Sequence, residues 1–107
     1  MTTLKEFRKK LAYVNSRLES LSDEEKSALC IYTKDGYFVR FALANNGFIR
    51  RWSRVSEPEA TRVSQEEAVR LLKMMPRQWR YGTIEHVLKI QKMAYEAVIE
   101  ALEEAFV

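Results

Sequence analysis

The sequence predicts one α+β domain, in which a three-stranded antiparallel meander sheet has helices before and after it. Three apolar runs follow one another across residues 28–55, and the gaps between them contain Asp-Gly and Asn-Gly pairs typical of tight β-turns. On both sides of this segment, apolar residues recur every three or four positions, which is the spacing of amphipathic helices. A chain of 107 residues can bury one sizeable core, so we expect a single domain over residues 1–107.

The first predicted helix covers residues 3–20. It begins with a capping box, because Thr3 precedes Glu6 by three positions. One continuous apolar stripe follows, made of Leu4, Phe7, Leu11, Val14, Leu18 and Leu21. The basic residues lie away from this stripe, so the outer side of the helix should be positively charged. A cap-like cluster over residues 22–25 ends the helix and starts a short turn before the sheet.

Three strands are predicted over residues 28–33, 37–44 and 48–55. With Asp35 and Gly36 as a two-residue loop, the first hairpin acquires one almost wholly apolar face. That face carries Ala28, Cys30, Tyr32, Lys34, Tyr37, Val39, Phe41 and Leu43. We expect the helices to pack mainly on this one face.

The turn over residues 45–47 leaves the register of the second hairpin open. A two-residue loop would direct Trp52 and neighbouring arginines towards the core, which is costly unless each charge is paired. A three-residue loop with a left-handed Gly47 pairs Leu43 with Ile49 and buries one arginine position instead of three. We favour this second register. It creates an open sheet face that carries Phe38, Arg40, Phe48, Arg50, Trp52 and Arg54.

Two further helices are predicted over residues 65–75 and 84–105. The first follows a capping box at residues 64–67 and ends at Pro76, and the second follows Thr83. Residues 56–63 are expected to form a loop, because Pro58 disfavours a central strand. The connector between the two helices, residues 77–82, is basic and aromatic.

Charge is distributed unevenly along the chain. The net charge of +3 arises from +3 in residues 1–20, +5 in residues 34–80 and −3 in residues 81–107, with the remainder in residues 21–33. Asymmetry of this kind points to a polyanionic partner, although ordinary solubility charge produces similar patterns.

Arginines beside aromatic rings favour a nucleic-acid-binding function. Rings stack on unpaired bases while guanidinium groups meet phosphates, so DNA or RNA is the expected partner. The predicted nucleic-acid-binding residues are Arg40, Arg50, Trp52, Arg54, Arg77, Trp79 and Arg80. A structural alternative packs Phe38 and Trp52 beneath the last helix, with the arginines stretched along its acidic residues. A functional alternative is a protein-interaction module, a homodimer built on the last helix or the first.

No catalytic, metal or cofactor site is predicted. His86 is the single histidine and has neither a neighbouring cysteine nor an evident nucleophile, so we expect no zinc site and no enzyme. The single cysteine, Cys30, lies on the predicted core face and fits a reducing, cytoplasmic setting. The apolar runs are too short to span a bilayer, so no membrane association is expected.

Overall fold

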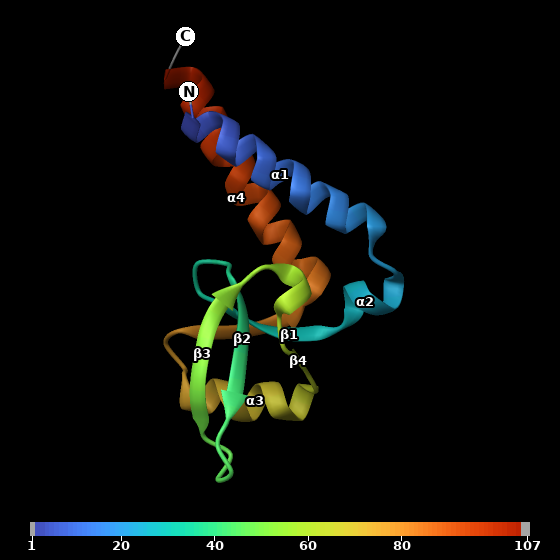
Figure 1. The fold of residues 1–107 in the computed structure, drawn as a ribbon, viewed down its shortest axis with the longest axis vertical. Helices are drawn as coiled ribbons and strands as arrows, with labels where there is room; N and C mark the ends of the chain where they lie inside the picture. Colours follow the sequence, from blue (N-terminus) through green and yellow to red (C-terminus); the bar gives the residue numbers. More distant parts are fainter. Residues whose placement is uncertain (1, 106–107) are drawn as a thin grey trace.

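The computed structural model describes residues 2–105, which form a sheet lobe and a projecting pair of helices (Figure 1). This helical arm consists of α1 (Thr2–Ser20) and α4 (Ile84–Ala105), and the ends of the described chain lie at its tip. The molecule is elongated, with principal extents of 55 × 29 × 17 Å. Within residues 2–105, no helix combines the length and the apolar character needed to cross a membrane.

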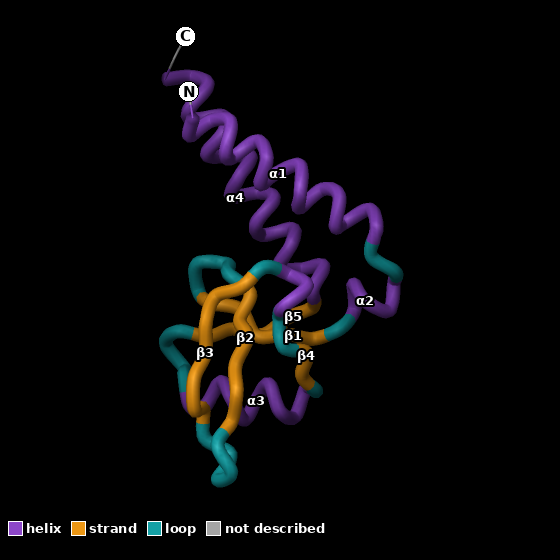
Figure 2. The backbone as a smooth tube through the Cα atoms, in the orientation of Figure 1, coloured by secondary structure: helices purple, strands orange, loops and turns teal. Residues whose placement is uncertain are grey.

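The sheet contains five antiparallel strands, two more than predicted. The central strand β1 (Leu29–Thr33) pairs with β5 (Trp79–Thr83) over its whole length. It also pairs with β4 (Arg62–Val63) near its start and with β2 (Phe38–Leu43) near its end. β3 (Ile49–Val55) lies at the edge beyond β2. In Figure 2, β1 and β5 run roughly horizontally, whereas β2 and β3 run roughly vertically.

The two additional strands come from segments expected to be irregular. Residues 56–63 form the short 3₁₀ helix η1 (Glu57–Glu59) and then β4, and the basic connector contains β5. Its residue Trp79 has no exposed surface, so β5 contributes one of the largest core side chains. Helix α2 (Asp23–Ser27) occupies the predicted short turn and is capped by Ser22. The three long helices agree with the predicted bounds to within one residue, including α3 (Gln65–Met74).

Helices cover both faces of the sheet, so the prediction that they pack mainly on one face is wrong. On one face, Cys30 and Phe38 pack with Val14 of α1 and Leu88 of α4. The second cluster comprises Ile31, Val39, Ala68, Leu71 and Trp79, and it lies between the other face and α3. Adjacent residues of a strand point to opposite faces, and both Cys30 and Ile31 are fully buried. Because Cys30 and Ile31 point to opposite faces and both are buried, the core lies on both sides of the sheet.

The first hairpin differs from the prediction by one residue. Its loop has three residues, because the Thr33 amide donates to the Tyr37 carbonyl at 2.8 Å, and Gly36 is left-handed with φ of 91°. Tyr32 therefore pairs with Phe38 and not with Val39. The slip places Phe38 on the α4 face and Val39 on the α3 face, opposite to the predicted arrangement.

The second hairpin has the predicted three-residue loop, and the pairing of Leu43 with Ile49 is confirmed. The predicted register beyond it is wrong, because the ladder shifts between Ala42 and Leu43. Arg50 is the extra residue of a β-bulge, and Phe41 consequently pairs with Trp52. The physical reason is packing, since the bulge brings the Trp52 ring to the α3 side of the sheet.

Candidate nucleic-acid interface

The predicted open face does not exist as one surface. The Trp52 ring lies on the α3 side, edge-on to Trp79 with ring centroids 5.7 Å apart and planes at 90°. Phe38 is fully buried on the opposite, α4 side. Arg40 pairs with Ser53, the neighbour of Trp52, and therefore also points away from the Trp52 face. The structural alternative holds for Phe38, which packs with α4, and fails for Trp52.

Three of the seven predicted residues do converge. Trp52, Arg54 and Arg77 line a shallow hollow of about 200 Å³, together with Lys34. This β3 hollow joins β3, the first hairpin turn and the segment before β5. Asp35 is the acidic residue in its lining and lies 3.6 Å from Arg54. Both side chains of that ion pair are more than half exposed, so the pair is weak, and Lys34 and Arg77 leave the lining with a net positive charge.

Two other predicted arginines, Arg40 and Arg50, lie elsewhere on the hairpin. Arg40 and Arg51 line a second hollow, of about 630 Å³, on the face that carries Phe38. The Arg40 guanidinium is 3.8 Å from the Glu59 carboxylate. Arg50 is exposed at the bulge and lines neither hollow. Arginines thus project from both sides of the edge strand.

The remaining two residues come from β5. Trp79 has no exposed surface, so its ring is not accessible to a ligand in this conformation. Arg80 is exposed, but it pairs with Tyr32 on the α4 side of the sheet, away from the β3 hollow. Its guanidinium donates to the Trp79 carbonyl at 2.9 Å. The connector therefore contributes Arg77 to the hollow, and not the basic and aromatic group that was predicted.

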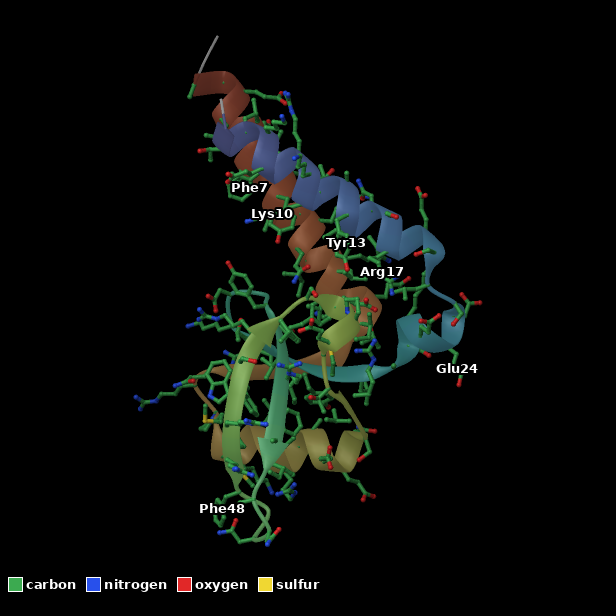
Figure 3. All side chains as sticks on the ribbon, in the orientation of Figure 1. Phe7, Lys10, Tyr13, Arg17, Glu24 and Phe48 are labelled. Atoms are coloured by element: carbon green, nitrogen blue, oxygen red, sulfur yellow. The ribbon has the colours of Figure 1, made fainter. Side chains whose placement is uncertain are left out.

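Another cleft, which the sequence did not indicate, lies between the helical arm and the sheet lobe, beside the end of β3 and the first hairpin turn. We call it the arm cleft; its volume is about 530 Å³. Its basic and aromatic lining residues are Lys9, Lys10, Tyr13, Tyr37, Arg54 and Tyr95. Figure 3 shows Lys10 and Tyr13 along α1, above the sheet lobe. Their three-residue spacing indicates a shared flank of a helix, but nothing in the sequence places that flank opposite the hairpin.

A buried carboxylate holds the arm to the lobe beside this cleft. Glu57 is 2% exposed, and its carboxylate lies 3.0 Å from the Arg17 guanidinium and 3.4 Å from that of Arg62. Arg62 also donates to two backbone carbonyls of the η1 segment. These contacts satisfy the carboxylate, so Glu57 has a structural role.

The described residues offer no evident reactive centre. Burial raises the pKa of the Cys30 thiol from 9.0 to about 12, which keeps the thiol protonated and unreactive at neutral pH. Residues 2–105 contain no cluster of three or more His, Cys, Asp or Glu that could hold a metal ion. His86 is exposed and lies edge-on to the Tyr32 ring, 6.0 Å between centroids.

No family model, curated protein sequence or solved structure matches the chain.

Proposed function

We propose that the chain is an intracellular nucleic-acid-binding protein that uses the β3 hollow. The observation that carries the proposal is the convergence of Trp52, Arg54, Arg77 and Lys34 from three separate segments. Guanidinium and ammonium groups bind phosphates, and a partly exposed indole ring offers a stacking surface for a base. The cytoplasmic location rests on the single buried thiol, which suits a reducing compartment. The proposed activity is binding, with no catalytic step.

Titration of fluorescent DNA and RNA oligonucleotides tests the proposal. Arg77→Ala and Arg54→Ala should each weaken binding about 3- to 10-fold and reduce the slope of log K against log salt by about one. Both side chains are exposed, so neither change should unfold the protein. Lys26→Ala, a single-charge control on α2, should leave the affinity within about twofold. Absence of binding to every oligonucleotide at low salt would overturn the proposal.

The helical arm favours a second candidate function, assembly into a homodimer. In α1, Val14 is the one buried residue among those described, and beyond Leu88 Ile99 is the one buried residue among those described in α4. The other apolar residues of the arm remain partly in water, including Leu4, Phe7, Leu11, Val98 and Leu102. Two helices alone cannot cover their own apolar stripes, whereas four helices in a bundle can.

Opposite charges on the two helices indicate a second copy of the chain as the covering partner. α1 carries five basic and two acidic residues, and α4 carries two basic and five acidic residues. The basic start of α1 lies beside the acidic end of α4, as the 3.0 Å ion pair between Arg8 and Glu103 shows. In a two-fold bundle, each α1 can face the partner's α4, so opposite charges meet twice.

A charge exchange between two variants tests this candidate. One variant carries Lys5→Glu and Lys9→Glu, and the other carries Glu100→Lys and Glu104→Lys. Each variant alone should dissociate at least tenfold more readily in sedimentation equilibrium, because like charges then meet across the interface. An equimolar mixture should restore the dimer. A wild-type monomer at high protein concentration would exclude assembly through the arm, and so would a mixture that stays monomeric.

A further inference from the structure

The arm cleft is a basic and aromatic recess that lies outside the two hollows of the β2–β3 hairpin. Residues of α1 and α4 line one side of it, and Tyr37, the end of β3 and the segment that follows β3 line the other. Figure 1 shows the two helices side by side beyond the sheet lobe. A volume of about 530 Å³ lies within the range of pockets that hold small organic groups. Arg54 lines both this cleft and the β3 hollow, so the two recesses adjoin.

Three tyrosines present their rings to the cleft. Tyr13 is 45% exposed and Tyr37 is 46% exposed, which is unusual for large rings that serve only the core. Tyr95 is half-buried, and burial together with the neighbouring Tyr37 raises the pKa of its hydroxyl. Stacking on a base needs such rings, with one face held by the protein and the other open.

Positive charge lines the rim of the cleft. Lys9 and Lys10 come from α1, and Arg54 comes from β3, where its guanidinium lies 5.2 Å from the centre of the Tyr37 ring. The acidic lining residue is Glu57, whose charge is offset by Arg17 and Arg62. The Arg54 guanidinium is also 3.6 Å from Asp35, an exposed pair of small effect. The cleft is therefore complementary to a ligand with both anionic groups and flat rings.

We infer that the arm cleft receives unpaired bases of a single-stranded nucleic acid, whose backbone continues past Arg54 into the β3 hollow. This inference rests on the proposed nucleic-acid binding and adds the type of strand. A duplex keeps its bases stacked inside and presents phosphates outside, so its bases cannot reach Tyr13 or Tyr37. A single strand offers both the base faces and a flexible phosphate backbone.

The test compares a single-stranded oligonucleotide with a duplex of the same sequence. The single strand should bind at least tenfold more tightly. Tyr13→Ala should weaken single-strand binding about tenfold, the effect expected for one lost stacking contact, and Tyr13→Phe should retain the wild-type affinity. Lys10→Ala provides a second probe of the same wall. Phe48→Ala is the matched control, because Phe48 is 61% exposed at the far tip of the hairpin (Figure 3).

Photocrosslinking with 5-iodouridine oligonucleotides and mass spectrometry gives an independent readout. Crosslinks at Tyr13, Tyr37 or Tyr95 would support the inference. Equal binding of single strand and duplex would overturn it, as would an unchanged affinity for both Tyr13→Ala and Lys10→Ala. If Arg77→Ala still weakens binding in either case, the proposed function stands without the cleft. If no oligonucleotide binds at all, both fail together.

Discussion

The two hairpin turns of the sheet have the same backbone geometry and different surroundings. In each, a glycine amide donates at 2.9 Å to the carbonyl three residues earlier, from Gly36 to Thr33 and from Gly47 to Ala44. Both glycines are left-handed, with φ of 91° and 84°. The first turn is packed against α4, where the Gln91 amide donates to the Gly36 carbonyl at 2.8 Å. The second turn projects from the lobe.

The strands after these turns show that loop length alone does not decide which side chains face the core. Ile49 and Trp52 are three positions apart, and in a regular strand they would point to opposite faces. Both nevertheless pack against the α3-side cluster around Trp79. The exposed bulge residue Arg50 makes this arrangement feasible, because one extra residue reverses the alternation. The comparison indicates that packing around Trp79 fixes the second register.

The largest expected effect comes from removing that packing. Trp79→Ala should destabilise the protein by about 3–5 kcal/mol, because it empties a fully buried indole site. Trp52→Ala, at the half-buried partner ring, should cost about 1–2 kcal/mol, since water already reaches part of that ring. Urea denaturation followed by circular dichroism measures both. Equal losses would mean that the edge-on pair acts as one unit and would contradict the assigned order of burial.

The sequence predicted the helices well, because each has a continuous apolar stripe and a local start or stop signal. Ser64 caps α3 through the Glu67 amide at 3.1 Å, in agreement with the capping pattern. Local signals of this kind act within one turn of helix. They predict the helix bounds correctly because they depend only on residues that are close in the sequence.

The candidate site was predictable only in part, because it depends on register and on distant contacts. No local sequence pattern indicates the bulge at Arg50. The bulge places Trp52 on the face opposite to that of Phe38, whereas the prediction had both on one face. β5 was missed because Trp79 and Tyr81 alternate over a very short segment whose partner, β1, lies some fifty residues earlier. Tyr13 and Tyr37 both line the arm cleft, and contacts between segments distant in the sequence bring them there as well.

Deletion of single residues from β3 tests the bulge directly. Without Arg50, Ile49 and Arg51 can occupy adjacent ladder positions opposite Leu43 and Ala42, so every side chain keeps its face. The deletion should cost about 1 kcal/mol or less. Deleting Ser53 instead should cost about 3 kcal/mol or more, because either Trp52 or Val55 must then leave its cluster. Chemical denaturation of both deletions provides the comparison, and a larger loss for the Arg50 deletion would refute the bulge assignment.

Alanine at the two turn glycines should separate backbone strain from packing. Each change places a side chain in the left-handed region, which costs about 1–2 kcal/mol. At position 36 the new Cβ would also lie 3.3 Å from Ile90 on α4, whereas at position 47 it would lie 3.5 Å from the flexible Arg70 guanidinium. Gly36→Ala should therefore be the more destabilising, by about 1 kcal/mol. Thermal unfolding of the two variants measures the difference, which would vanish if α4 moved freely away from the turn.

The smallest effect concerns the hydrogen bond that joins the first turn to α4. Gln91→Ala removes the donor to the Gly36 carbonyl and should cost about 0.5–1.5 kcal/mol. Arg70→Ala removes the corresponding donor to the Gly47 carbonyl, at 2.9 Å, and should cost less, because water can replace it at the exposed tip. Since the first turn also forms part of the arm cleft through Tyr37, Gln91→Ala should increase hydrogen exchange at the Tyr37 amide, whereas Arg70→Ala should not. Unchanged exchange at Tyr37 would show that the turn is held by its own geometry and needs no support from the arm.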